Sequence, residues 1–303
     1  MLRTFAAFAA AMLLASPAAA QPDPNRLFAD SKVVVRDRFS DEVVGKGPDL
    51  VFIPGLASSR VTWKATAERL RGKYRLHLIQ VAGFAGEPAR ANATGEVVIP
   101  TAEAIDAYLV EQKLSPAVVI GHSLGGTMSL YLAQKHPEHL RKVLIVDALP
   151  FYAVAMMGPQ ASVEKVAPMA AKIRDAKWDG DSAAYGKSME PQIARMVTAP
   201  ADRAMVVNWS VQSDHGVVMR ALYDDLTLDL RPGLAAMTTP IVLLYPDNVP
   251  AGAPQGVMDK MYPPIFAPAA TIKAQRIDKS LHFIMLDQPQ AFAAALDAFL
   301  TQP

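Results

Sequence analysis

The sequence predicts an α/β protein with an eight-stranded, mostly parallel sheet, helices on both faces and a helical cap insertion. From about residue 31 onward, short β-branched runs alternate with longer stretches of helical periodicity. This alternation stops after Asp147 and resumes only at Ile241. The 303 residues, 51% of them hydrophobic, suffice for one core that carries an insertion.

The candidate strands are short apolar runs bounded by turn-forming residues. They cover residues 33–35, 43–44, 50–53, 76–81, 117–120, 143–146, 241–245 and 271–277. A polar turn around Ser40-Asp41 separates the first two runs, which we therefore expect to form an antiparallel hairpin at the start of the sheet.

The candidate helices have apolar residues at three- and four-residue spacing. They cover residues 63–70, 101–114, 124–135 and 290–300. Two core segments, 21–148 and 240–303, flank an insertion at 149–239 that is rich in methionine. Methionine forms adaptable apolar surfaces, so the insertion can be a lid over an apolar pocket as well as ordinary helix packing.

The first twenty residues have the features of a secretory signal peptide. Arg3 precedes an apolar stretch at 5–14, and Ala18-Ala19-Ala20 before Gln21 offers a cleavage site. The apolar stretch is too short to span a bilayer, which needs about 20 apolar residues. We therefore expect a secreted or periplasmic protein without stable membrane insertion after cleavage; the alternative is an uncleaved N-terminal anchor.

Charge and cysteine content exclude several classes of protein. Lys+Arg 30 against Asp+Glu 29 gives a net charge of +1, and loss of Arg3 would leave the mature chain neutral. A strongly basic nucleic-acid binder is excluded, and the absence of cysteine excludes a disulfide scaffold. We expect no nucleic-acid partner.

The most informative segment is Gly121-His122-Ser123-Leu124-Gly125, which lies between an apolar run and a helical pattern. A serine between a strand and a helix in a G-x-S-x-G motif is typical of a nucleophile elbow. Side chains two residues before and after the serine would collide in such a turn, which explains Gly121 and Gly125. Gly126 lets the helix pack closely.

A serine hydroxyl needs an adjacent base to become a good nucleophile, and six histidines are candidates. His282 is preferred because it follows the last strand run and precedes the C-terminal helix. The other five fit less well: His122 flanks the serine and should point away, His77 lies within a strand, His136 and His139 lie in a loop, and His215 lies in the insertion. With no third ligand in view, the His136 and His139 pair predicts a solvated loop rather than a metal site.

With these motifs in order, the chain resembles an α/β-hydrolase fold enzyme over nearly all of its mature length. The order nucleophile, acid, histidine fits Ser123, an aspartate and His282. The tail that begins with Leu281-His282-Phe283 and ends with Ala298-Phe299-Leu300 is similar to the family's histidine loop and closing helix. Phe52-Ile53-Pro54-Gly55-Leu56 resembles its oxyanion loop, with Pro54 in place of the usual histidine. The resemblance implies that the backbone amides of Leu56 and Leu124 form the oxyanion hole.

The resemblance leaves two candidates for the acid. Asp247 directly follows the strand run that begins at Pro240, although the family's acid usually falls one or two residues later. Asp147, at the end of an earlier strand run, occupies the place that some family members use. We prefer Asp247, with Asp147 as the alternative.

A serine nucleophile argues against the dehalogenase and epoxide hydrolase branches of the family, which use a carboxylate at this position. The resemblance therefore implies a serine hydrolase, a probable carboxylesterase, that cleaves an ester of a small apolar substrate and needs no cofactor or metal. The alternatives are a lactonase, a cofactor-free perhydrolase or a carbon-carbon bond hydrolase with the same triad. A non-catalytic ligand-binding homologue is the alternative from a different class.

Overall fold

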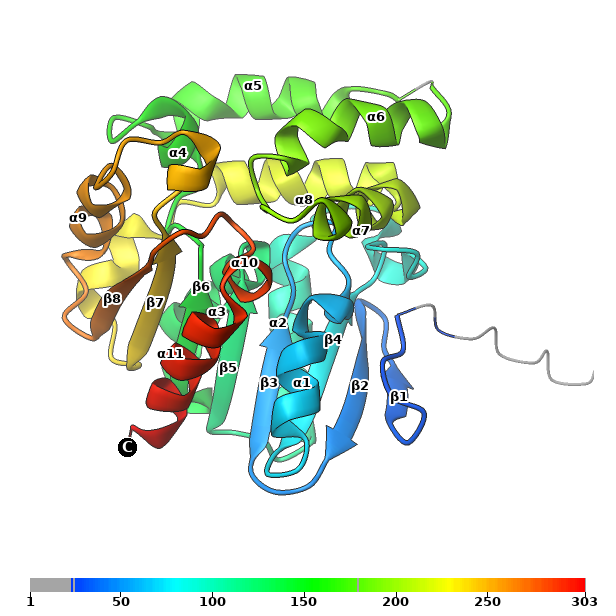
Figure 1. Ribbon diagram of the computed structural model, residues 1–303, viewed down its shortest axis with the longest axis vertical. Coiled ribbons are helices and arrows are strands. Elements are labelled where there is room, and N and C mark those ends of the chain that lie inside the picture. Colours follow the sequence, from blue (N-terminus) through cyan, green and yellow to red (C-terminus); the bar gives the residue numbers. More distant parts are fainter. Residues whose placement is uncertain (1–22, 24, 179, 303) are drawn as a thin grey trace, which may run out of the picture.

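The computed structural model describes residues 23, 25–178 and 180–302 (Figure 1). The predicted signal peptide, residues 1–20, lies outside the described residues, and so does Gln21. Within the described part of the chain, no helix combines the length and the apolar character needed to cross a membrane.

Each of the eight predicted runs is a strand, which confirms the predicted fold class. The strands are β1 (Lys32–Val35), β2 (Phe39–Gly45), β3 (Asp49–Ile53), β4 (Arg75–Val81), β5 (Ala117–His122), β6 (Leu140–Val146), β7 (Ile241–Pro246) and β8 (Ile272–Ile277). They form one sheet in the order β1-β2-β4-β3-β5-β6-β7-β8. The β1–β2 hairpin is antiparallel as expected, but the predicted turn is wrong, because Ser40 and Asp41 lie within β2 and pair with β1. Strand β2 also pairs antiparallel with β4, and the remaining pairs are parallel.

The sheet is buried on both faces, as the continuous apolar runs require. In β5, Val119 joins one hydrophobic cluster whereas Val118 and Ile120 join another, because successive side chains point to opposite faces. Ile105 belongs to the first cluster and Phe292 to the second, so helices cover each face.

The core helices are α1 (Lys64–Leu70), α2 (Val98–Glu111), α3 (Leu124–Lys135), α9 (Tyr262–Phe266), α10 (Ile284–Asp287) and α11 (Pro289–Thr301). Helices α1 and α11 lie in front of the sheet in the view of Figure 1, and α2 and α3 lie behind it. Short 3-10 helices occur at Arg60–Trp63, Arg90–Ala93, Pro137–His139, Arg231–Ala236, Val249–Ala251 and Met258–Lys260.

Among the described residues, five α-helices follow β6 before the chain returns to the sheet as β7. They are α4 (Ala153–Met157), α5 (Val163–Asp175), α6 (Ser182–Ile193), α7 (Pro200–Gln212) and α8 (His215–Thr227). Figure 1 shows α5 to α8 across the edge of the sheet at which the parallel strands end. A separate apolar cluster holds α5 against α8 through Val166, Ala170 and Leu226. Part of the methionine content serves packing, since Met237 is buried, whereas Met156 and Met157 are exposed.

Candidate active site

Ser123 occupies a sharp turn between β5 and α3. Its φ of 52° and ψ of −123° place a non-glycine residue in a sparsely populated region of backbone space. The turn is fixed on both sides: the Ser123 N–H donates to the Val146 carbonyl at 2.9 Å, and the Ser123 carbonyl accepts from the Thr127 N–H at 3.0 Å. Such conformations cost about 1–3 kcal/mol and cluster at functional sites.

The glycines around Ser123 are required by close backbone approach. A Cβ on Gly121 would lie 2.3 Å from the Gly125 carbonyl oxygen, and a Cβ on Gly125 would lie 2.3 Å from the Ile53 carbonyl oxygen. A Cβ on Gly126 would lie 2.7 Å from the Ala148 Cβ. No side chain fits at 121 or 125 without displacing backbone, which agrees with the steric reason given for the motif, and a side chain at 126 would collide with those of Ala148 and Ile145.

His282 and Asp147 form the histidine–carboxylate pair of the site. His282 Nδ1 lies 2.6 Å from Asp147 Oδ2, although 135 positions separate the two residues. Asp147 follows β6 with a φ of 50° and is buried. Its other oxygen, Oδ1, accepts a hydrogen bond from the Tyr262 hydroxyl in α9. Both oxygens of this carboxylate therefore have a donor.

The structure corrects the preferred assignment of the acid, because Asp247 is not the carboxylate that contacts His282. Asp247 Oδ1 accepts from the Val249 N–H at 3.2 Å, and Oδ2 accepts from the Lys279 N–H at 2.9 Å. The flanking Asn248 and Lys279 have left-handed φ angles of 55° and 57°. Asp247 therefore ties together two strained loops, and Asp147, the alternative, takes the position beside the histidine.

His122, next to Ser123, supports the histidine loop. Its Nε2 lies 3.0 Å from the His282 carbonyl oxygen, and the two ring centroids are 4.6 Å apart. Burial lowers the pKa of His122 well below its ordinary value. The ring is therefore neutral, with its proton on Nε2, because a carbonyl oxygen can only accept. The contact of His122 with His282 could not be read from the motif.

The loop after β3 lies against the nucleophile. A Cβ on Gly55 would come within 2.9 Å of the Ser123 Cβ and 3.4 Å of its Oγ. Across the part of the chain that the structure describes, neither the Leu56 N–H nor the Leu124 N–H donates to a protein acceptor. Leu124 is also the first residue of α3, where the helix dipole favours negative charge. Both amides are therefore available to a developing oxyanion.

Asp225 of α8 brings a second buried carboxyl group to the region of Ser123 and His282. No sequence motif predicted it. Burial raises its pKa to about 6, although the nearby Thr127 hydroxyl, a hydrogen-bond donor, and His282 oppose this shift. Thr127 lies one turn into α3 from Ser123. Among the described residues, Asp225 Oδ1 is buried without a hydrogen-bond partner.

Two other candidate histidines lie elsewhere. His77 is buried in β4, where Nδ1 lies 2.9 Å from Asp41 Oδ2 and 2.6 Å from the Tyr108 hydroxyl. His215 begins α8, with its ring centroid 5.5 Å from that of Tyr185. A structural role fits both.

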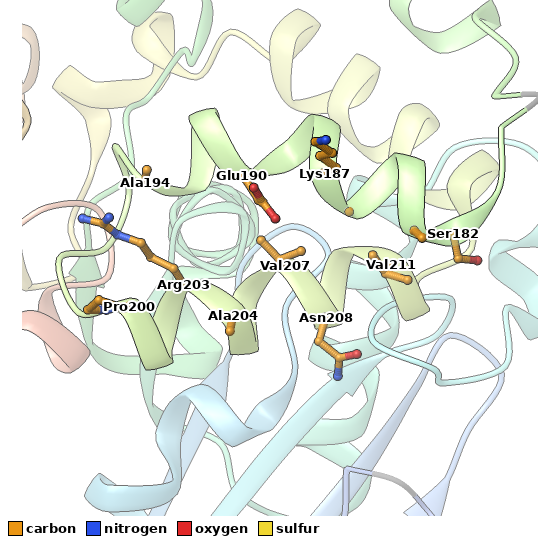
Figure 2. A pocket seen from close by; sticks show the side chains of 12 residues that line it. Ser182, Lys187, Glu190, Ala194, Pro200, Arg203, Ala204, Val207, Asn208 and Val211 are labelled. Carbon is orange, nitrogen blue, oxygen red and sulfur yellow. The ribbon is translucent and has the colours of Figure 1, made fainter.

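The cap contains a hollow of about 740 Å³ between α6 and α7 (Figure 2). Lys187 and Glu190 line it from α6, and Arg203 and Asn208 from α7. No predicted site residue lines this hollow. It is a feature of the cap surface, separate from the Ser123 turn.

Comparison with known proteins gives a family match over most of the chain. The model described as "Alpha/beta hydrolase family" matches residues 50–295. A pimeloyl-[acyl-carrier protein] methyl ester esterase from Aeromonas hydrophila is 26% identical over 272 residues, covering 86% of this chain and 98% of the relative. The enzyme of that name from Vibrio cholerae is 26% identical over 273 residues, covering 86% of this chain and 97% of the relative.

Solved structures show the same fold at low sequence identity. An esterase from Exiguobacterium antarcticum has a TM-score of 0.71 at 18% identity, covering 87% of this chain and 96% of that structure. An enol-lactonase from Burkholderia xenovorans has a TM-score of 0.67 at 17% identity, with coverages of 87% and 96%.

Proposed function

The chain belongs to the alpha/beta hydrolase family, and we propose that it is a serine esterase that cleaves the carboxylic ester of a small apolar substrate through an acyl-enzyme intermediate. One arrangement carries this proposal: the strained Ser123 turn is hydrogen-bonded to Val146, the residue before Asp147 of the Asp147–His282 pair, and among the described residues the Leu56 and Leu124 amides donate to no protein acceptor. Esterase relatives aligned over nearly their whole length support it.

In the acylation step, Ser123 Oγ attacks the ester carbonyl carbon and His282 Nε2 takes the hydroxyl proton. The carbonyl oxygen becomes an oxyanion and accepts hydrogen bonds from the Leu56 and Leu124 amides. The C–O bond to the alcohol then breaks, and His282 gives its proton to the leaving oxygen. Asp147 stabilises the imidazolium formed in between and keeps the ring oriented.

Deacylation repeats these steps with water as the nucleophile. His282 Nε2 takes a proton from the water, which attacks the acyl carbon, and Ser123 leaves with that proton restored. The carboxylic acid is released and the enzyme returns to its starting state. Ser123, His282 and the two amides perform this cycle without a cofactor.

The relatives support a simple alkyl ester as the substrate class, because their names specify a methyl ester. The apolar cap helices over the end of the sheet support an apolar acyl group. Asp225 is the polar exception and offers one unpaired oxygen near the site.

The test uses hydrolysis of p-nitrophenyl esters of increasing acyl length, together with a matched series of methyl esters. Ser123→Ala should lose several orders of magnitude in kcat, because the covalent route is gone. Ser188→Ala, on an exposed part of α6, is the matched control and should keep full activity. Activity that persists in Ser123→Ala would refute the proposal.

We also propose that the protein is exported and that cleavage leaves Gln21 as the first residue. The support is the charge and apolar pattern of residues 1–20. N-terminal sequencing of protein from a fractionated expression host tests this, and a retained Met1 in the membrane pellet would contradict it.

A further inference from the structure

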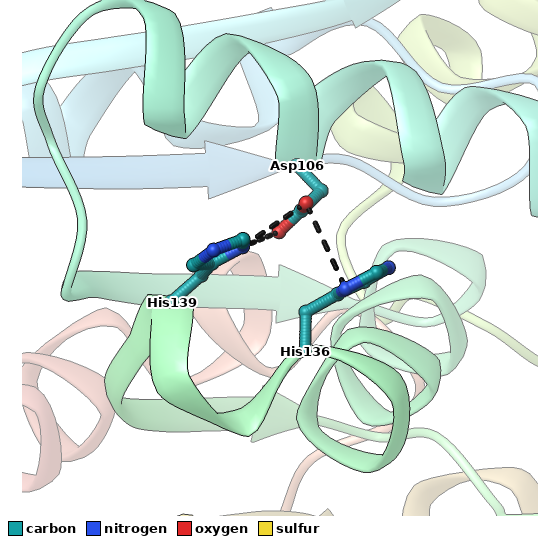
Figure 3. Close-up of side chains that lie close together, drawn as sticks. All are labelled: Asp106, His136 and His139. Carbon is teal, nitrogen blue, oxygen red and sulfur yellow. Dashed lines mark hydrogen bonds and ion pairs between the residues drawn. The ribbon is translucent and has the colours of Figure 1, made fainter.

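A cluster of titratable side chains lies at the end of α3 that is remote from Ser123. Figure 3 shows Asp106 of α2 facing His136, directly after α3, and His139 of the following 3-10 helix. The sequence alone shows the two histidines without a third ligand, because Asp106 lies 30 or more positions away on another helix.

The three side chains present nitrogen and oxygen atoms to a common point. One potential ligand atom from each residue lies within 4.8 Å of the other two. His139 Nδ1 is 2.9 Å from Asp106 Oδ1, and His136 Nδ1 is 4.0 Å from Asp106 Oδ2. The imidazole rings are stacked, with centroids 5.7 Å apart and planes 9° from parallel.

A second carboxylate holds the outer nitrogen of one histidine. His136 Nε2 lies 3.0 Å from Glu103 Oε2, one turn before Asp106 on α2, while Glu103 Oε1 accepts from the Tyr131 hydroxyl at 2.6 Å. His136 therefore bonds a carboxylate through Nε2, while its Nδ1 faces the same point as the ligand atoms of Asp106 and His139. Histidines that bind metal ions have this arrangement.

We propose that His136, His139 and Asp106 bind a divalent transition-metal ion of the Zn²⁺ class, with Glu103 orienting His136. Two imidazoles and one carboxylate are a donor set that suits zinc and its neighbours better than calcium or magnesium. The fourth position faces solvent, because about a quarter of each histidine side chain is exposed whereas Asp106 is buried.

Metal binding requires only small side-chain movements. Tetrahedral zinc with bonds near 2.1 Å separates its ligand atoms by roughly 3.4 Å. The His139–Asp106 contact of 2.9 Å must therefore open slightly, and the His136–Asp106 distance of 4.0 Å must shorten. The backbone already fixes all three residues, because α2 and α3 pack together in the core.

The ion would tie α2 to the segment that leads from α3 into β6, far from the catalytic turn. The 12 residues of α3 separate this cluster from Ser123, a distance of about 18 Å along the helix. The expected consequence of binding is higher thermal stability, since a ligand that binds only the folded state stabilises it. Ester hydrolysis should not require the ion.

The test is calorimetric titration of untagged, chelator-treated protein with Zn²⁺ at pH 7.5, paired with Co²⁺ absorption spectra. We expect one ion per chain with micromolar affinity, and melting at a temperature several degrees higher at saturation. His139→Ala should weaken binding at least a hundredfold, and Glu103→Gln about ten- to a hundredfold. His215→Ala, in the cap, is the matched control and should bind as the unaltered chain does.

Binding should also weaken in acid, because an imidazole nitrogen that carries a proton cannot coordinate a metal ion. The alternative role of the cluster is a set of histidine–carboxylate ion pairs. Absence of saturable binding at 100 µM Zn²⁺, with His139→Ala still folded in the circular dichroism spectrum, would establish that alternative and refute the metal site. Equal loss of binding in His215→Ala and His139→Ala would refute it as well.

Discussion

Replacement of Asp147 by asparagine should inactivate the enzyme while leaving it folded, and the hydrogen bonds around the carboxylate explain why. Oδ1 accepts from Tyr262 and Oδ2 faces His282 Nδ1 at 2.6 Å. An asparagine at this position has one acceptor oxygen and one donor nitrogen. The Tyr262 hydroxyl keeps the amide oxygen, so the amide NH₂ group faces His282 and forces Nδ1 to accept.

The imidazole proton then lies on Nε2, where it prevents His282 from taking the proton of Ser123. The wrong tautomer and the lost stabilisation of imidazolium together cost about ten-thousandfold in turnover in comparable triads. This factor corresponds to about 5.4 kcal/mol of transition-state free energy. Asp247→Asn is the matched control: it perturbs only the contacts with Val249 and Lys279, so turnover should change less than tenfold.

The assay is kcat for p-nitrophenyl acetate at pH 8, with the melting temperature of each variant measured in parallel. The double variant Asp147→Asn/Tyr262→Phe frees the amide to turn its oxygen toward His282. Its kcat should therefore be at least tenfold higher than that of Asp147→Asn. An inactive but folded Asp247→Asn, beside an Asp147→Asn of nearly normal activity, would refute the assignment. A double variant no better than Asp147→Asn would refute the tautomer argument.

Two further predictions concern the surroundings of Ser123. Gly55→Ala should lower kcat by about tenfold or more with little loss of stability. The reason is that its Cβ would lie 2.9 Å from the Ser123 Cβ and so displace the oxyanion loop. An unchanged kcat in steady-state assays would show that this loop does not pack closely against Ser123. Asp225 carries a pKa raised to about 6, so ionising it in the folded protein costs stability as the pH rises from about 4 to 6, up to about 3 kcal/mol. Asp225→Asn should therefore melt at a higher temperature than the unaltered chain above pH 6 and at nearly the same temperature at pH 4. If the melting temperature of the unaltered chain instead rises relative to that of Asp225→Asn as the pH increases, the buried charge is contradicted.

Much of the fold could be predicted from the sequence because the sheet is buried on both faces. Runs such as 143–146 and 241–245 contain mainly β-branched residues and leucine, which mark parallel strands directly. The nucleophile turn was predictable for a similar reason, since only glycine fits at 121 and 125. These are local constraints, and local constraints are visible in a sequence.

The acid could not be predicted because it depends on which of two loops turns toward His282. Asp147 and Asp247 each end a strand, and β6 and β7 are neighbours whose carboxyl ends meet at one edge of the sheet. The sequence places both aspartates at that edge but does not show that Asp247 satisfies backbone amides of its own loops. The side chains that other helices contribute, Asp225 and Asp106, were missed because tertiary packing alone brings them to their neighbours.

The central claim is that Ser123 is a nucleophile activated by its surroundings. Incubation of the purified protein with a fluorophosphonate, followed by intact-mass and peptide mass spectrometry, tests it without knowledge of the substrate. The account predicts one phosphonyl group per chain, located on Ser123, absent in Ser123→Ala and formed far more slowly in His282→Ala. An unlabelled but folded protein, or a label that persists in Ser123→Ala, would contradict it.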